Sequence, residues 1–260
     1  MNSSLEKIAN KTATLFSGIG YLQLTKGQGV QGSVTDVVGK AIRTTARGPE
    51  PLSDVLSQLQ RSRIGESWTK RAMDILGAGF ALLVFLPLLI TIAMAVRLES
   101  GGPVIFKQRR TGHNGRIFTI YKFRTMTVAE DCADVRQATR GDSRVTEVGA
   151  LLRKLSLDEL PQFLNILKGD MSIVGPRPHA LAHDAQYGEQ IATYADRFRA
   201  KPGLTGLAQV TGLRGEIRDL GCMDDRVRAD NLYIESWSVG LDIAILAKTA
   251  LIIFRDPQAY

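Results

Sequence analysis

The apolar segment at residues 75–96 constrains the fold of this chain more than any other feature. No charged residue interrupts it. A straight helix of that length would reach roughly 33 Å, which is enough to cross a bilayer core of about 30 Å. On length alone the segment is therefore typical of a single transmembrane helix. Hydrophobic residues make up only 44% of the chain, which excludes a protein with many membrane spans.

Pro87 and the charges on both sides of this segment favour a different path. Proline removes the backbone hydrogen bond to Leu83, which predicts a kink or a break in the helix. Both flanks are rich in basic residues, namely Arg61, Arg63, Lys70, Arg71 before the segment and Arg97, Lys107, Arg109, Arg110, Arg116, Lys122, Arg124 after it. Because basic flanks remain on the cytoplasmic side, we expect a re-entrant helix that dips into the membrane, bends at Pro87 and returns.

The overall charge and the cysteines limit the partners of the chain. A net charge of +7 and a pI near 9.5 favour an anionic partner, which could be nucleic acid, acidic lipid or a phosphorylated substrate. Cys132 and Cys222 are far apart and form no CxxC pair, which indicates a reduced setting without a sulfur-bound metal. The first residues lack the basic-then-apolar pattern of a signal peptide.

Local patterns predict one hairpin and several helices. Residues 103–126 read as extended segments around a turn at residues 112–115. Apolar spacing predicts helices at residues 145–155 and 160–167, and Gly169 is a suitable stop for the second helix. Residues 187–198 read as one further helix.

Both ends of the chain have patterns of their own. Residues 1–50 are rich in Gly, Ser and Thr and predict loose order, and a short helix is expected directly after Pro51. Residues 236–254 form an amphipathic pattern that is interrupted by Asp242 and Lys248. This pattern suits a helix in the membrane interface better than a helix that crosses the membrane.

Two adjacent carboxylates, Asp158 and Glu159, stand where a helix should begin, within residues 155–162 (LSLDELPQ). Ser156 through Glu159 matches the capping box S-x-x-E, so the two acids could serve only the helix terminus. If Asp158 is the N-cap, however, Pro161 falls at the third helical position and offers no N–H to it. The Asp158 carboxylate would then be free to face a ligand.

Five basic residues from separate parts of the chain are candidates for phosphate binding: Lys122, Arg124, Arg153, Arg177 and Arg214. Arg177 stands between two prolines that restrict its backbone, so it could act as a pre-organised clamp. Carboxylates among fixed cations can handle a metal ion and a phosphate together. Nucleic-acid binding would require a basic helix or strand with exposed aromatic residues, and the aromatic residues here mostly have core spacing.

These motifs resemble the bacterial sugar transferase family, the monotopic polyprenyl-phosphate phosphoglycosyl transferases. The resemblance covers residues 65–257 in one consistent order. Its motifs are residues 70–74 (KRAMD), Pro87, 121–126 (YKFRTM), Asp158-Glu159, 168–172 (KGDMS), 174–178 (VGPRP), 202–206 (PGLTG) and 233–238 (YIESWS). Residues 178–180 (PHA) and 212–216 (GLRGE) look like the branch that makes undecaprenyl-diphosphate-linked glucose for exopolysaccharides. The chain differs at Leu207, where many members have an aromatic residue, and it lacks the N-terminal transmembrane bundle of larger members.

The resemblance and the patterns together predict a small monotopic membrane enzyme of the α/β class, with mainly helical structure. We expect an N-terminal extension at residues 1–64, partly disordered with one short helix. A re-entrant membrane anchor follows at residues 65–100. Residues 101–260 are expected to form a compact cytoplasmic catalytic domain that ends in the interfacial helix.

The resemblance also implies the reaction and the roles of individual residues. A sugar-1-phosphate, from a hexose such as glucose, would pass from a UDP-sugar to undecaprenyl phosphate with release of UMP, at the cytoplasmic face of the bacterial inner membrane. Asp158 would be the nucleophile that forms a covalent phosphosugar intermediate, and Glu159 would help to hold Mg²⁺. Arg153 and Arg177 would grip phosphate oxygens, with Lys122 or Arg124 nearby.

The implied partners and the rival functions complete these expectations. Besides its substrates, the enzyme would contact membrane lipid, and downstream glycosyltransferases are possible partners. A homo-oligomer is also possible, and no binding of nucleic acid is expected. The main alternative is a non-catalytic, membrane-tethered scaffold of polysaccharide assembly. A membrane-associated nucleic-acid binder is a third interpretation, and salt-sensitive DNA binding would be its signature.

Overall fold

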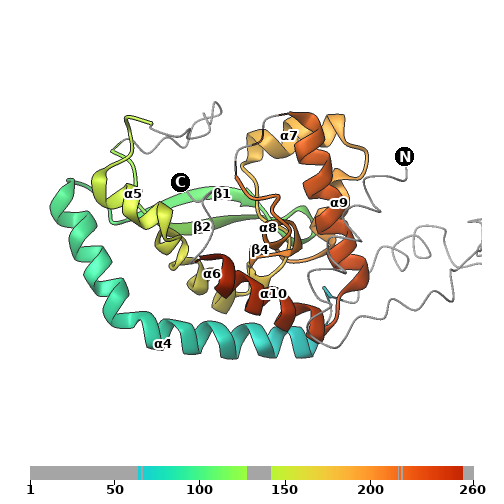
Figure 1. Ribbon diagram of the computed structural model, residues 1–260, viewed down its shortest axis with the longest axis horizontal. Coiled ribbons are helices and arrows are strands. Elements are labelled where there is room, and N and C mark those ends of the chain that lie inside the picture. The colour runs from blue at the N-terminus through green and yellow to red at the C-terminus, as the bar shows by residue number, and fades with distance from the viewer. Residues whose placement is uncertain (1–63, 66, 128–141, 216, 218, 254–260) are drawn as a thin grey trace, which may run out of the picture. The chain divides into compact units, whose positions relative to one another are not determined.

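The computed structural model describes residues 64–65, 67–127, 142–215, 217 and 219–253. The described part is mainly helical with few strands, as predicted (Figure 1). Its helices are α4 (Trp68–Glu99), α5 (Glu147–Lys154), α6 (Gln162–Lys168), α7 (Leu181–Gln190), α8 (Leu207–Val210), α9 (Leu220–Ser236) and α10 (Val239–Ile253). Short 3-10 helices occur at η1 (His113–Gly115), η2 (Leu157–Glu159) and η3 (Tyr194–Arg199). The short helix expected after Pro51 lies outside the described residues.

Two small sheets carry the described strands. Strands β1 (Ile105–Thr111) and β2 (Ile117–Phe123) form an antiparallel hairpin that turns at η1, which confirms the predicted extended segments and their turn. Strands β3 (Ser172–Val174) and β4 (Gly203–Thr205) pair in parallel. Just beyond β3, the backbone of Gly175 lies so close to Gly203 that a Cβ atom on either residue would collide with backbone atoms. Glycine is therefore required at this contact.

Helix α4 contains the apolar segment. It begins at Ser67, whose side chain accepts a hydrogen bond from the backbone N–H of Lys70, and it runs through Pro87 without interruption. Figure 1 shows that the helix is bent. By length and composition it could cross a membrane, and little of its most apolar stretch is buried within the protein. The predicted effect of Pro87 is thus a kink and not a break.

Both ends of α4 pack against the same folded body. Near its start, the Asp74 carboxylate accepts hydrogen bonds of 2.9 Å from the hydroxyl of Ser172 and from the backbone N–H of Ile173. Near its end, Ile92 and Val96 join a buried cluster with residues of β2 and α5. Large apolar side chains are exposed between these ends: Leu76, Phe80, Leu83, Val84, Leu86, Ile90 and Met94. The middle of α4 therefore presents an uncovered apolar surface.

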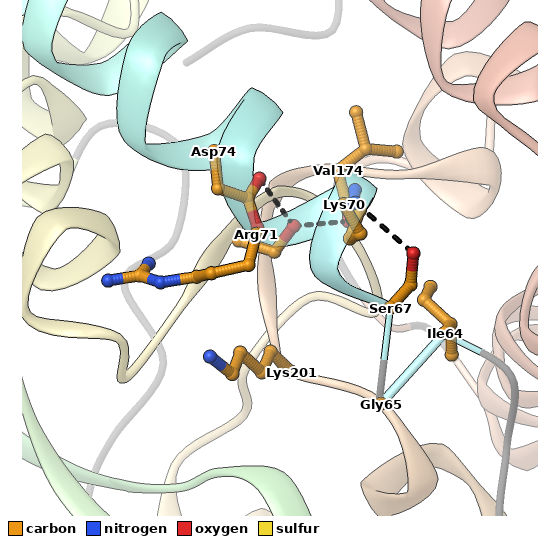
Figure 2. A pocket seen from close by; sticks show the side chains of 9 residues that line it. Ile64, Gly65, Ser67, Lys70, Arg71, Asp74, Val174 and Lys201 are labelled. Atoms are coloured by element: carbon orange, nitrogen blue, oxygen red, sulfur yellow. Dashed lines mark hydrogen bonds between the residues drawn. The ribbon is translucent and has the colours of Figure 1, made fainter.

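The first turn of α4 is fixed by a buried ion pair. Lys70 Nζ donates hydrogen bonds to the Val174 carbonyl at 2.9 Å and to the Asp242 carboxylate at 2.7 Å. Asp242 also accepts from the Tyr233 hydroxyl at 2.7 Å and from the Trp237 indole at 3.2 Å. Figure 2 shows the pocket beside this turn, in which the side chains of α4 face β3 and the loop of Lys201. We call Lys70, Val174, Tyr233, Trp237 and Asp242 the anchor joint.

The anchor joint corrects the interpretation of the C-terminal helix. Asp242 does not interrupt an apolar face, because its side chain is 1% exposed and paired with Lys70. The exposed positions of α10 include Ile243, Ala247 and Leu251, which follow helical spacing. The helix therefore exposes an apolar stripe and buries its acidic residue.

Residues 187–198 do not form the single helix that the apolar spacing predicts. Helix α7 ends at Gln190, and Ile191 has an extended conformation (φ −119°, ψ 106°). The chain then restarts as the 3-10 helix η3. The four apolar residues still point inward, since Ile191 and Tyr194 are buried and Tyr187 and Phe198 pack against them. The predicted single helix is therefore wrong, although the residues that suggested it do pack together.

Candidate active site

The two adjacent carboxylates lie on η2, the short turn between α5 and α6. Ser156 precedes this turn in the left-handed conformation (φ 57°), and its side chain makes no capping bond. Its hydroxyl instead accepts a hydrogen bond of 2.6 Å from Arg214 Nη2. The capping-box interpretation is therefore wrong. Asp158 and Glu159 are instead presented on a single half-buried turn of backbone that Arg214 supports.

Glu159 is held between two cations. Its carboxylate accepts hydrogen bonds from Lys122 Nζ at 2.8 Å and from both terminal nitrogens of Arg177, at 2.6 and 3.2 Å. Burial alone would raise the pKa of Glu159, but the charges of Arg177 and Lys122 hold that pKa well below its usual range. Glu159 is thus anionic, and it fixes the position of both cations.

Asp158 has different surroundings. Its carboxylate has no hydrogen bond or ion pair with any other residue that the structure describes. Burial raises the pKa of Asp158, while the nearby positive charge of Lys122 opposes this shift. Arg153 and Arg177 act in the same direction as Lys122, and Glu159 acts against them. The group is therefore close to several cations without being locked to one, so its oxygens remain open to a ligand.

Four of the five predicted basic residues meet around η2. Lys122 comes from β2, Arg177 from the loop after β3, and Arg214 from the loop after α8. Arg153, near the end of α5, donates through Nε to the Thr125 hydroxyl at 3.1 Å, and its charge acts on Asp158. The structure thus collects cations from four separate segments.

Arg124 is the predicted residue that the structure does not bring to this cluster. Its guanidinium donates to the carbonyls of Gly101 and Ser100, at 2.7 and 2.6 Å, at the end of α4. The period of two along a strand places Arg124 on the same face as Lys122, but β2 ends at Phe123. The alternation stops before it reaches Arg124.

A buried network supports Arg177 from behind, and the sequence patterns did not predict its residues. Arg197 Nη2 donates to the Arg177 carbonyl at 2.6 Å, and Arg197 is also paired with Asp230 at 2.9 Å. Arg197 Nη1 lies 2.8 Å from His179 Nδ1. Burial, reinforced by the charge of Arg197, keeps the pKa of His179 well below its usual value, so the neutral ring can accept this hydrogen bond. His179 lies before α7, so it does not share a helix face with His183.

The positive charge of Arg177 also acts on two further guanidiniums, those of Arg110 and Arg226. Burial and then Arg177 lower the pKa of Arg110 to about 10 and lower that of Arg226 as well. Arg226 donates to the Gly215 carbonyl at 2.7 Å, next to Arg214. On the same helix, Arg228 forms a 2.6 Å pair with Asp224 in a more exposed position. Only the charge of a residue distant in the sequence links Arg110 and Arg226 to this site, so no local sequence pattern could have predicted them.

The residues on η2 match the oxygen ligands that Mg²⁺ prefers. Within the described residues, no group of three or more His, Cys, Asp or Glu side chains could hold a metal ion. Mg²⁺ requires only one or two protein carboxylates when phosphate oxygens and water complete its shell. Asp158 and Glu159 can supply these, although Glu159 already binds two cations. The donor set therefore fits Mg²⁺ that arrives with a phosphorylated substrate.

A free carboxylate beside a pinned one, surrounded by cations, is suited to phosphoryl transfer through a carboxylate nucleophile. The chain belongs to the bacterial sugar transferase family, whose model matches residues 65–256. This match confirms the family that the sequence motifs indicate.

The chain is similar to several curated proteins. Over 198 residues the chain is 50% identical to the UDP-glucose:undecaprenyl-phosphate glucose-1-phosphate transferase of Caulobacter vibrioides, and this match covers 76% of the chain and 74% of the relative. A protein of the same name from Escherichia coli K12 is 52% identical over 191 residues. The match covers 74% of the chain but 41% of that relative. The exopolysaccharide production protein PSS of Rhizobium leguminosarum bv. phaseoli is 42% identical over 186 residues, which is 93% of its length.

Proposed function

We propose that the protein transfers glucose-1-phosphate from UDP-glucose to undecaprenyl phosphate and releases UMP, as the first membrane step of exopolysaccharide synthesis. The names of relatives at 50% and 52% identity support the substrates. The observation that carries the proposal is the contrast on η2, where Asp158 is open and Glu159 is pinned by Lys122 and Arg177.

The proposed reaction has two displacements at one phosphorus atom. A carboxylate oxygen of Asp158 attacks the β-phosphorus of UDP-glucose, and the bond to the bridging oxygen breaks as UMP leaves with the electron pair. An oxygen of undecaprenyl phosphate then attacks the same phosphorus and releases the Asp158 carboxylate. Arg153 and Arg177 would stabilise the charge on the phosphate oxygens. Arg214 would keep η2 in place through Ser156.

Mg²⁺ is the cofactor that we propose for this site. Asp158 and Glu159 would hold it, and it would neutralise the diphosphate of the donor. Lys122 and Arg177 would keep Glu159 ionised, and therefore able to bind a cation, at any pH at which the enzyme works.

The proposed location is the cytoplasmic face of the inner membrane, with α4 as a re-entrant anchor. Four observations support this topology: the exposed apolar middle of α4, Pro87 within it, the basic flanks, and the packing of both its ends against one body. The packing of both ends against one domain favours a helix that keeps both ends on the same side of the bilayer. The apolar stripe of α10 would rest in the interface beside it.

A UMP-release assay tests the function directly. Purified protein would be given a panel of UDP-sugars with and without undecaprenyl phosphate. We expect turnover with UDP-glucose when the acceptor is present. Without the acceptor, we expect a burst of at most one UMP per enzyme, because the aspartyl intermediate would accumulate. Absence of turnover with every donor would favour the scaffold alternative.

A further inference from the structure

Arg110 is a half-buried cation that forms no ion pair with a carboxylate of the described part of the chain, although Asp184 and Glu159 act on it from a distance. Its guanidinium has one hydrogen bond there, from Nη2 to the side-chain oxygen of Gln108. Its Nε is buried without any acceptor. Two more deeply buried arginines are satisfied differently, since Arg197 is paired with Asp230 and Arg124 binds backbone carbonyls. Arg110 thus keeps both charge and donor capacity unused.

The position of Arg110 connects it with the carboxylate site. Its backbone forms a bridge with Ala180, three residues after Arg177. Its charge is affected by Arg177, Asp184 and Glu159, which places it within electrostatic range of the pinned carboxylate. The charge of Arg177 acts against the charge of Arg110, and an anion between or beside two guanidiniums relieves such repulsion. The surplus positive charge here is what a doubly charged ligand would compensate.

We propose that Arg110 binds a phosphate oxygen of the diphosphate of the nucleotide-sugar, beside Arg177. The proposal rests on the proposed function for the identity of the ligand, and it adds a binding residue from β1 to those around η2. Arginine suits this task because its planar set of donors matches phosphate oxygens in pairs. The diphosphate would then be held from two directions, by the β1 hairpin and by the loop after β3.

Arg109 offers a matched control on the same strand. It is the adjacent residue, so its side chain lies on the opposite face of the hairpin, and it is exposed. The experiment compares Arg110→Gln, Arg110→Lys and Arg109→Gln in detergent-solubilised full-length protein. Two kinds of measurement are made for each variant: binding, as the Kd for UDP and for inorganic pyrophosphate, and turnover, as kcat and KM for UDP-glucose. Thermal unfolding gives the folded fraction, and each Kd is referred to folded protein.

We expect Arg110→Gln to weaken the binding of both diphosphates by roughly tenfold or more, as lost charge-assisted hydrogen bonds do. The KM for UDP-glucose should rise with it. Arg110→Lys should recover part of this loss, and Arg109→Gln should match the unmodified protein within about twofold. Unchanged diphosphate binding in folded Arg110→Gln would overturn the proposal, and so would an equal loss in Arg109→Gln.

The same data separate this proposal from the proposed function. If the unmodified protein bound diphosphates through Arg110 but released no UMP, the function would fail and the binding role would stand. If it turned over UDP-glucose while Arg110→Gln bound UDP normally, only the role of Arg110 would fail. A protein that bound neither UDP nor pyrophosphate would contradict both.

Discussion

Glu159 and Arg177 form a two-pronged contact in which both terminal guanidinium nitrogens reach the carboxylate, at 2.6 and 3.2 Å. The backbone of Arg177 is fixed in turn by the prolines at either side and by Arg197 at its carbonyl. The backbone and the side chain of Arg177 are therefore both held by other groups of the protein. The same contact keeps Glu159 ionised. Arg177 thus maintains the charge of Glu159, and Glu159 holds the guanidinium of Arg177 in position.

Asp158→Asn should abolish turnover while leaving the fold intact, because a neutral amide cannot attack phosphorus. Asp158 makes no hydrogen bond to another described residue, so its replacement removes no contact there. UMP release measures the loss, and mass spectrometry should find the covalent phosphosugar only in the unmodified enzyme. Asp196→Asn, at a half-exposed site on η3, is the control. Near-normal UMP release from Asp158→Asn would contradict the role of nucleophile.

Glu159→Gln should cut the rate sharply and raise the Mg²⁺ concentration for half-maximal activity by roughly tenfold, because a hard cation loses an anionic ligand. A Mg²⁺ titration of UMP release measures both quantities. Glu159→Asp keeps the charge, so its rate and its Mg²⁺ midpoint should lie between those of the unmodified enzyme and those of Glu159→Gln. If the rate fell but the Mg²⁺ midpoint stayed unchanged, Glu159 would act by holding Lys122 and Arg177 and not as a metal ligand.

Lys122→Met should shift the acid limb of the kcat/KM profile to higher pH. The nucleophile must be ionised, so activity falls as the pH drops through the pKa of Asp158. Burial raises that pKa and Lys122 partly restores it, so loss of this cation raises it further. Lys122→Arg keeps the charge and should leave the limb in place. An acid limb that did not move in Lys122→Met would show that another group controls it.

Cysteine labels should place both ends of α4 on the cytoplasmic side. Suitable sites are Thr69 and Gly101, which are exposed, in a background where Cys132 and Cys222 are replaced. Pro87→Leu restores the missing backbone hydrogen bond and removes the clash of the proline ring, which together cost a helix about 3 kcal/mol, and it should straighten the helix. Part of that variant should then cross the membrane, expose position 69 outside and lose activity. Labels on opposite sides in the unmodified protein would refute the re-entrant anchor.

Asp242→Asn should destabilise the protein by about 3–5 kcal/mol, because it leaves the Lys70 ammonium buried without its partner. Removing both charges with Lys70→Met should cost less than the sum of the single changes. Unfolding in detergent gives these values. Asp224→Asn, in a more exposed pair with Arg228, should change stability by less than about 1 kcal/mol. Equal effects of Asp242→Asn and Asp224→Asn would argue against a structural role for the anchor joint.

Local patterns were sufficient where the structure is locally determined. The hairpin, the end of α6 at Gly169 with its positive φ of 94°, and the apolar segment all follow from neighbouring residues. The carboxylates and Arg177 became candidates because of unusual neighbours, namely Pro161 for the carboxylates and two prolines for Arg177, and the structure brings them together.

The remaining features depend on partners that are distant in the sequence. Asp242 read as a solvent-facing interruption because its partner Lys70 lies 172 positions away. Ser156 read as a cap because Arg214, which occupies its hydroxyl, comes from another loop. Arg110 lacked any local mark, since its significance comes from the charge of Arg177. No window of sequence contains these pairs, so only the folded chain brings them together.

The packing of α4 also determines how the protein can be handled in the laboratory. Ala78 is fully buried against Ile120, Ile166 and Met171, and Val96 is buried against the end of β2. Deletion of the helix would therefore strip side chains from two interior clusters, and would not simply release a domain from its tether. We therefore expect that deletion of α4 will not yield a soluble, folded enzyme. Detergent or lipid must replace the bilayer around an intact α4, and any truncation that keeps activity has to begin before Ser67.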